Sequence, residues 1–437
     1  MSDAPTPGTR AAARTTSSIS HAWRALRHRN FQLYFVGQGI SLIGTWMTRL
    51  ATSWLVYRMT HSALLLGVVS FAGQIVALAF GPVAGAWVER LDRRALLVWT
   101  QAAAAAQSLA MAALTLTHRI TLDEILALAA LQGLIAAFDM PARQSFLVQM
   151  VDDRHDLGNA IAMNSSVVNA TRLIGPAIAG AVIAAFGVGW CFLIDGVSYF
   201  AVIASLAVMR LRPATQAAPV GPLFAQIREG WRYVRGFRPI RTVLWLFFFQ
   251  SLVGWPYMVL LPVFAARVLH GDAHTLGALS AASGFGALLS ALALALRRSV
   301  VGLTRTLRSA TALLGAGLVL FGLSHALWLS LATVVLAGFG LMQSAAVCNT
   351  ILQSLVPDGM RARVMSYYTM AFFGAAPFGS LLAGALSDRI GAPLTVAASG
   401  VACLAGALWY SHELPRIGAI VAPIYRAKGL PVPPKGF

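Results

Sequence analysis

The sequence predicts an all-α membrane protein in which twelve transmembrane helices form two six-helix bundles, with both termini in the cytoplasm. Three observations predict this fold class. Of the 437 residues, 58% are hydrophobic and only 11% are charged, whereas soluble domains carry roughly 25% charged residues. Apolar runs of about 20 residues recur along the whole chain. Arginines gather in the short polar stretches between these runs.

Twelve apolar segments are each long enough to cross a hydrocarbon core of about 30 Å as a helix. Six of them precede the polar stretch 211–240, and six follow it. In chain order they are 31–57, 62–88, 95–117, 122–140, 160–185, 189–209, 242–266, 275–297, 305–324, 327–350, 364–387 and 393–411.

The basic residues predict the orientation of these spans. The chain has 33 Lys and Arg residues against 15 Asp and Glu residues, a net charge of +18. The two tails and every second connection lie on one side, which carries 27 of the basic residues, against 4 on the other side. Basic connections stay in the cytoplasm, so both tails are predicted there. No basic face of the kind that binds nucleic acid is evident.

Weak internal repeats predict the domain organisation. An offset of 204 residues aligns Gly180 with Gly384 and Gly187 with Gly391, and an offset of 210 aligns Gly67 with Gly277. Parallel repeats of this kind are typical of transporters. We therefore expect six-helix bundles over 22–210 and 241–411, flanked by a disordered N-tail over 1–21 and a C-tail over 412–437.

The polar stretch 211–240 joins the two predicted bundles. Its first part is broken by prolines. Its second part places apolar residues at helical spacing with arginines between them, which is typical of an amphipathic helix on a membrane surface. A solvated tether is the alternative interpretation.

The connection between the second and third spans carries a candidate gating motif. A small residue there permits close helix contact, and an acidic side chain can neutralise a facing helix N-terminus or an arginine. A basic loop that only sets topology is the alternative. The motif residues are Gly85, Glu89, Arg90, Asp92, Arg93 and Arg94. The segment resembles the loop signature of the major facilitator superfamily, with Asp92 where that superfamily usually has glycine.

Further stretches resemble one bacterial branch of that superfamily, the enterobactin-exporter-like or transmembrane secretion effector group, over residues 31–410. They are Gly44–Trp46, Leu55–Tyr57, Pro141–Gln144, Asn169–Pro176, Asn349–Gln353, Val356–Asp358 and Arg361–Ser366. The resemblance implies alternating access between two bundles and export of hydrophobic or siderophore-like molecules, generally coupled to protons.

Span five carries Gly175, Pro176 and Gly180, which resemble the antiporter-type signature of the superfamily. A proline in mid-span removes a backbone hydrogen bond and kinks the helix, while glycines permit tight packing. We expect these residues to shape the seam between the halves. Span eleven has a looser counterpart that includes Pro377.

Ionisable residues inside spans are costly and are therefore candidates for function. Arg49 and Asp195 lie at similar depth, roughly 9–12 Å from the outer boundary at 1.5 Å per residue, and an ion pair between them is predicted. Asp139 and Arg143 are i,i+4 neighbours that could pair. Arg172 has no carboxylate at its depth, so it either bonds helix carbonyls or attracts an anionic substrate. Asp195, Arg49, Asp139 and Arg172 are the candidates for proton coupling.

Four glutamines lie at nearly one level, roughly 10–12 Å from the cytoplasmic boundary, in the spans that line the central cavity in the resembling superfamily. They are Gln38, Gln132, Gln250 and Gln343. Buried glutamines need partners, so this level predicts a polar ring facing a wet substrate chamber. The nearby aromatics Phe35, Phe247 and Trp255 would supply its apolar walls. The alternative is that each glutamine bonds a neighbouring helix.

These observations favour a secondary active transporter of the bacterial inner membrane that exports a small amphipathic, drug-like or siderophore-like compound by proton antiport. An importer on the same fold and a non-transporting receptor are the alternatives. No catalytic set, phosphate loop or metal-ligand spacing is present in the sequence, so neither an enzyme nor a cofactor is expected. The expected partners are the substrate, protons and the lipid bilayer, with the chain acting as a monomer.

Overall fold

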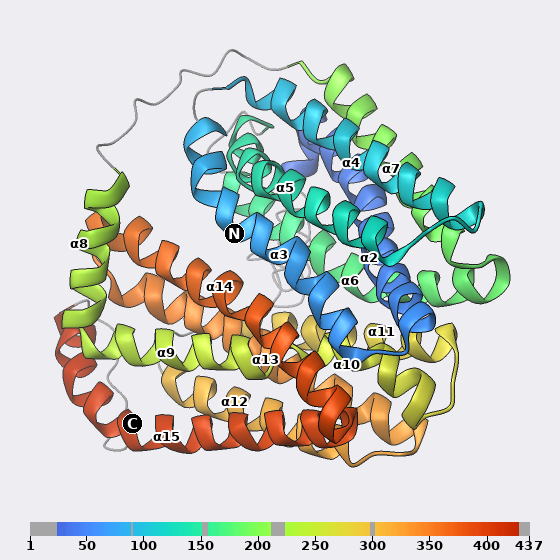
Figure 1. Cartoon of the computed structure of the whole chain (residues 1–437). Coiled ribbons are helices and arrows are strands. Elements are labelled where there is room, and N and C mark those ends of the chain that lie inside the picture. The colour runs from blue at the N-terminus through green and yellow to red at the C-terminus, as the bar shows by residue number, and fades with distance from the viewer. Residues whose placement is uncertain (1–23, 89–90, 151–155, 211–222, 298–301, 428–437) are drawn as a thin grey trace, which may run out of the picture.

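The computed structural model describes residues 24–88, 91–150, 156–210, 223–297 and 302–427, and these form helices joined by short connections (Figure 1). The N-terminal half begins with a short 3-10 helix, η1 (Arg24–Arg27). Its long helices are α2 (Arg29–Thr60), α3 (Ala63–Val88), α4 (Arg93–Leu116), α5 (Leu122–Leu147), α6 (Leu157–Phe186) and α7 (Val188–Val208), with the 3-10 turn η2 (Val148–Met150) after α5.

Helix α8 (Leu223–Gly236) precedes the C-terminal half. The elements of that half are α9 (Arg238–Val253), α10 (Tyr257–Val263), η4 (Phe264–Val268), α11 (Ala273–Ala295), α12 (Leu303–Gly322), α13 (Leu327–Leu355), α14 (Asp358–Ile390) and α15 (Ala392–Ala427). The elements α9, α10 and η4 together form one apolar span, Arg238–Val268, interrupted near Pro256.

All twelve predicted spans coincide with helices. Ten of the described helices are long and apolar enough to cross a membrane. The other two, α2 and α12, have 32 and 20 residues, so a count of twelve crossings stays a prediction. Helix α15 continues to Ala427, so residues 412–427 of the predicted C-tail are helical. The predicted N-tail, 1–21, and the first part of the linker, 211–222, lie outside the described residues.

Local sequence explains where several helices begin and end. Asp92 accepts a hydrogen bond from the Ala95 amide at 2.6 Å and so caps α4, as short acidic side chains do at helix starts. Gly187 and Gly391 end α6 and α14 with φ values of 94° and 87°, a backbone conformation that favours glycine. These two glycines are the pair aligned by the repeat, so the repeat marks equivalent helix ends.

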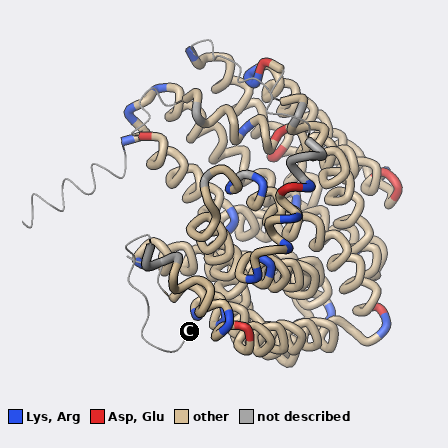
Figure 2. Tube along the Cα trace, turned by 90° about the vertical axis from the view of Figure 1, so that its left-hand side faces the viewer, with Lys and Arg blue, Asp and Glu red and all other residues tan. Residues whose placement is uncertain are grey.

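The helices converge on one side of the molecule and separate on the other. We call the side on which α2 begins, α8 lies and α15 ends the tail side, and its counterpart the far side (Figure 1). Figure 2 looks onto the tail side and shows basic positions spread over helix ends of both halves, with fewer acidic positions among them. This is the side that the charge distribution predicts to be cytoplasmic.

Three hydrophobic cores are distributed unevenly between the far side and the tail side. The shared core lies toward the far side and combines residues of both halves, among them Met47, Val56, Ile125, Tyr257, Phe264 and Phe321. Toward the tail side each half has a core of its own. The N-half core includes Phe31, Leu97 and Phe146, and the C-half core includes Val243, Phe247 and Ile351. The halves are therefore joined on the far side and separately packed on the tail side.

Helix α8 packs on the C-terminal half. Val234 is buried in the C-half core, the Trp231 and Tyr367 rings lie 5.9 Å apart, and Glu229 forms an ion pair of 2.7 Å with Arg363 of α14. Helix α8 is thus anchored to α14, and its location on a membrane surface stays a prediction.

Candidate functional site

Glycines let the two halves approach each other along two seams. In the seam between α6 and α11, a Cβ atom on Gly277 would lie 2.9 Å from the Pro176 carbonyl oxygen, and one on Gly180 would lie 2.9 Å from the Ala273 carbonyl oxygen. In the seam between α3 and α14, a Cβ atom on Gly67 or Gly384 would come within 2.6 Å of a facing carbonyl oxygen. Both seams therefore bring backbone against backbone.

The repeat relates these two seams to each other. Gly180 aligns with Gly384, and Gly67 aligns with Gly277. Each aligned pair thus supplies one glycine to each seam. The weak sequence matches therefore mark the contact surfaces between the halves, as a two-fold related pair of bundles requires.

The seam between α3 and α14 ends at an interaction across the halves that the sequence did not reveal. The carboxylate of Asp388, on the last turn of α14, accepts hydrogen bonds from the Ala63 amide at 2.8 Å and the Leu64 amide at 3.1 Å. It also accepts one from the Ser62 hydroxyl at 2.6 Å. A carboxylate of the C-terminal half therefore caps the N-terminus of α3, where the helix dipole favours a negative charge.

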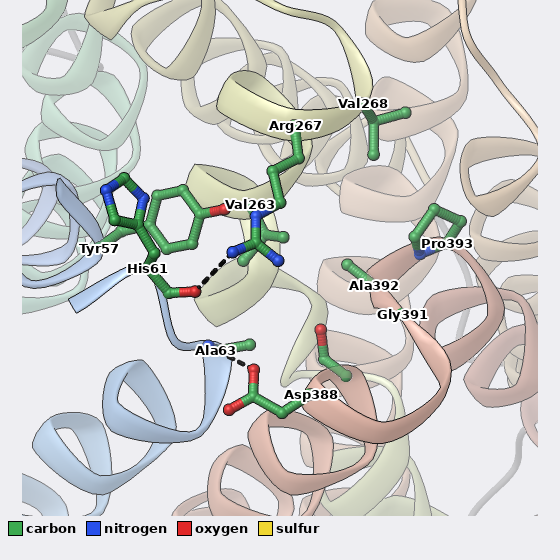
Figure 3. Close-up of a pocket in the computed structure, with 11 residues that line it drawn as sticks. Tyr57, His61, Ala63, Val263, Arg267, Val268, Asp388, Gly391, Ala392 and Pro393 are labelled. Carbon is green, nitrogen blue, oxygen red and sulfur yellow. Dashed lines mark hydrogen bonds between the residues drawn. The ribbon is translucent and has the colours of Figure 1, made fainter.

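Arg267 makes a second contact between the halves beside this cap. Its guanidinium donates a hydrogen bond of 2.8 Å to the His61 carbonyl oxygen and lies 5.8 Å from the centre of the Tyr57 ring. Figure 3 shows Arg267 and Asp388 on opposite edges of one small cavity of about 130 Å³. Small-molecule sites typically occupy about 300–1,000 Å³, so this cavity is smaller than a typical substrate site. We call Asp388, Arg267 and the α3 start the far-side lock.

Trp46, Arg49 and Arg172 form a cationic cluster in the interior. The Arg49 guanidinium lies 4.9 Å from the centre of the Trp46 ring, and the Arg172 guanidinium lies 5.2 Å from the same centre. Gly175 makes this arrangement possible, because a Cβ atom there would lie 2.5 Å from Trp46 Cβ. Two positive charges therefore share one aromatic ring, at distances typical of cation–π contacts.

The predicted ion pair between Arg49 and Asp195 is wrong. No ion pair within 4 Å joins them among the described residues. The Asp195 carboxylate instead accepts hydrogen bonds from the Thr48 hydroxyl at 2.8 Å and the Ser108 hydroxyl at 3.0 Å. Equal depth along two helices does not fix the direction in which two side chains point, and here Asp195 points toward α4 and the Thr48 face of α2.

Asp139 and Arg143 of α5 form the expected i,i+4 ion pair. The Asp139 carboxylate also accepts hydrogen bonds from the Thr100 hydroxyl at 3.0 Å and the Gln101 amide at 2.7 Å, both on α4. Asp139 is thus fully engaged within the N-terminal half. Its part in proton coupling stays a prediction.

The four glutamines do not form an exposed ring. Gln38, Gln250 and Gln343 are between 1% and 5% exposed. Gln250 donates to the Thr311 hydroxyl of α12 at 2.5 Å, and Gln343 accepts from the Ser290 hydroxyl of α11 at 2.8 Å. Gln250 and Gln343 therefore bond neighbouring helices, as the alternative interpretation expects, because buried amides in a membrane need partners. Gln132 is half-buried.

Trp255 belongs to an aromatic cluster in the C-terminal half. Its ring meets Phe372 edge-on at 4.7 Å, while Phe247 stacks on Tyr368 at 4.7 Å. Trp255 therefore lies beside aromatic side chains of α9 and α14. Its contact with substrate stays a prediction.

The loop motif after α3 is described only in part. Glu89 and Arg90 lie outside the described residues. Among the described residues, a Cβ atom on Gly85 would meet nothing within 4 Å, so none of them makes a close helix contact there. Asp92 caps α4. Arg94 donates to the Ala207 carbonyl oxygen of α7 at 2.8 Å, which ties the motif to its own half, and Arg93 opens α4.

The two prolines that are expected to shape the seam lie inside long helices, Pro176 in α6 and Pro377 in α14. Each of these helices faces the other half, through α11 and α3 respectively, so the expectation that this signature shapes the seam agrees with its location. Among the described residues no group of three or more His, Cys, Asp or Glu side chains could hold a metal ion.

A family model described as transmembrane secretion effector matches residues 20–428, nearly the whole chain. The chain belongs to this family of the major facilitator superfamily. This transporter family is not a family of enzymes, and the protein is a multi-pass, all-α protein of the bacterial inner membrane.

Curated relatives are similar to this chain over most of its length and most of their own. The staphyloferrin A transporter of Staphylococcus aureus is 25% identical over 385 residues, covering 85% of this chain and 93% of its own. The multidrug efflux pump Tap of Mycolicibacterium fortuitum is 28% identical over 356 residues, covering 80% and 87%. Macrolide efflux protein A of Streptococcus pyogenes is 21% identical over 375 residues, covering 84% and 92%.

Solved transporter structures share the fold. A bacterial homologue of the lysosomal transporter Spinster, in an inward-facing and unoccupied conformation, superposes with a TM-score of 0.69 at 14% identity, covering 87% of this chain and 96% of its own. A POT family transporter in complex with a thioalcohol-conjugated peptide gives a TM-score of 0.70 at 12% identity, covering 89% and 96%. At such low identity the likeness concerns the fold alone.

Proposed function

We propose that this transmembrane secretion effector protein is a secondary active transporter that exports a small amphipathic compound by alternating access, driven by proton antiport. The observation that carries the proposal is the asymmetry of the cores: the halves share one core toward the far side and have separate cores toward the tail side. Such a molecule can load substrate from the tail side and release it after the far-side lock opens.

The two seams support this mechanism. Their contacts run through glycines against backbone carbonyl oxygens, so the halves can rotate about them without repacking large side chains. The far-side lock would close one route while the other is open. Its hydrogen bonds join Asp388 and Arg267 of one half to the α3 start and His61 of the other.

The candidate for the proton site is Asp195. It is 2% exposed, and one of its carboxylate oxygens has no hydrogen-bond partner among the described residues. A buried carboxylate with an unpartnered oxygen has room to hold a proton there. Asp139 is the second candidate, and its carboxylate is already bound by Arg143, Thr100 and Gln101.

The names of the relatives supply test compounds, a macrolide and staphyloferrin A. In everted vesicles with an acidic interior, we expect uptake of at least one of them that depends on the protein and is abolished by a protonophore. Uptake confined to right-side-out vesicles would indicate an importer. No protein-dependent movement in either orientation, with a panel of amphipathic drugs included, would favour the non-transporting receptor.

A further inference from the structure

The cationic cluster of Trp46, Arg49 and Arg172 has no compensating negative charge in contact with it. Neither arginine forms an ion pair within 4 Å in the described part of the chain. The nearby carboxylate, Asp195, accepts its hydrogen bonds from Thr48 and Ser108. One carboxylate beside two guanidinium groups leaves an excess positive charge, which is costly inside a membrane unless something pairs with it.

The donors of these arginines are also incompletely used. Arg172 contacts Met342 Sδ at 3.9 Å, a weak acceptor, and its buried Nε–H group has no acceptor among the described residues. Both guanidinium groups are held near the same indole ring, so they repel each other at short range. An incoming anion would relieve this repulsion and use the free donors at once.

Groups of both halves lie beside the cluster. Arg49 is exposed although it lies well inside α2. Met342 belongs to α13 of the C-terminal half, and a Cβ atom on Gly284 of α11 would lie 2.7 Å from the Arg172 carbonyl oxygen. A ligand here would therefore contact groups that belong to both halves.

We propose that Arg49 and Arg172 form an oxyanion-binding site, with Trp46 positioning the two guanidinium groups, and that the compounds this protein transports carry a carboxylate or phosphate group. The proposal rests on the proposed transport function and specifies its substrate class. The planar guanidinium fork matches both oxyanions. Trp46 is a positioning residue, because its ring faces are directed at the arginines.

The test measures binding to the full-length protein in lipid nanodiscs by thermal stabilisation, since a ligand that binds only the folded state raises Tm. The probes are 2-naphthoate, 2-naphthyl phosphate, neutral 2-naphthamide and cationic 2-naphthylmethylamine. We expect at least one anion to stabilise the wild-type protein more than the amide and the amine do. The choice between the two anions identifies the oxyanion, and equal or stronger stabilisation by the amide or the amine would overturn the proposal.

Variants test the residues. Arg49→Gln and Arg172→Gln should each weaken anion binding by about tenfold or more, as loss of a charge-assisted hydrogen bond does, and Arg172→Lys should retain part of the affinity. Trp46→Leu should weaken anion binding while amide binding is unchanged, and Trp46→Phe should be milder. Arg119→Gln, at an exposed arginine in the connection after α4, is the matched control. Equal losses in that control, or none in either arginine variant, would contradict the assignment.

A vesicle assay with the same variants separates this inference from the transport function. If the wild-type protein exports compounds but the glutamine variants keep the same preference between anions and cations, the oxyanion site is wrong and the transport function stands. If anions bind as expected but no compound is moved, the site stands and the proposed function fails.

Discussion

Asp388 and Asp272 place the same chemical group at the start of a helix, with different consequences. Asp272 accepts hydrogen bonds from the His274 and Thr275 amides and so caps its own helix, α11. Asp388 caps α3 from the opposite half of the molecule. A cap within one helix stabilises that helix in every conformation, whereas a cap between halves stabilises only the conformation in which they meet.

Replacing Asp388 with Asn should therefore open the far side more often. Asn can still cap a helix, but it loses the attraction between the carboxylate charge and the α3 dipole, which contributes about 0.3–1 kcal/mol, so the population of the open form should rise about two- to fivefold. The measurement is the labelling rate of a Val263→Cys variant by a membrane-impermeant thiol reagent applied from outside. The native cysteines Cys191, Cys348 and Cys403 are buried and should contribute little background.

Asp272→Asn in the same Val263→Cys background is the matched control, and its labelling rate should stay close to that of the parent. If Asp388→Asn leaves the labelling rate unchanged, the carboxylate does not hold the far side closed.

Replacing Asp195 with Asn imitates a permanently protonated carboxyl group. The amide oxygen can still accept hydrogen bonds from Thr48 and Ser108, so the fold should persist. If Asp195 carries the transported proton, the variant should lose accumulation driven by a pH gradient and keep exchange of substrate down its own gradient. Both are measured in vesicles, with Asp123→Asn, at an exposed position, as the control. Full pH-driven accumulation in Asp195→Asn would exclude this residue as the coupling site.

At the scale of elements, the sequence predicted where the helices lie, but it did not predict several of the side-chain contacts between them. An apolar run of about 20 residues is sufficient to indicate a span, so all twelve segments coincide with helices. Depth along a span does not specify the direction of a side chain, which explains why Arg49 and Asp195 do not pair and why Gln250 bonds Thr311. The contact of Asp388 with α3 could not be predicted, because an acidic residue near the end of a span has no evident role until the facing helix is known.

The glycines of α6 permit a comparison within one helix. Gly180 packs against Ala273 and Gly277 in the seam with α11, whereas a Cβ atom on Gly158 would meet nothing within 4 Å. Gly180→Val should therefore separate the seam and abolish transport, while Gly158→Val should leave transport nearly intact. Transport and the amount of protein in the membrane are measured together, so that misfolding is separated from loss of movement. Equal activity of the two variants would show that the seam tolerates side chains.

At the scale of the whole molecule, the shared core joins the two halves on the far side in this conformation. Gly384 lies directly against Ala63 and Leu64 of the other half, and a Cβ atom on Gly384 would lie 3.0 Å from Leu64 Cα. This contact must break if substrate leaves on the far side. It is therefore a place at which the conformational cycle can be stopped covalently.

A double variant at the end of this seam, Ser62→Cys with Asp388→Cys, replaces two side chains that are hydrogen-bonded at 2.6 Å, and it should form a disulfide under oxidising conditions and trap this conformation. Transport should fall to the level of vesicles without the protein and return after reduction. Each single cysteine variant, treated in the same way, serves as the control. Undiminished transport in fully cross-linked protein would contradict the alternating-access mechanism.

The seams also affect which amino-acid substitutions such a protein can accept during evolution. Their contacts are made by glycines and backbone carbonyl oxygens, which are the same whatever side chains line the rest of each helix. In the proposed mechanism, substitutions near Trp46 or Arg172 can therefore alter which compounds are bound while the seam contacts stay the same. Proteins of this family that transport different compounds can thus keep the same seam contacts and the same relative motion of the two halves.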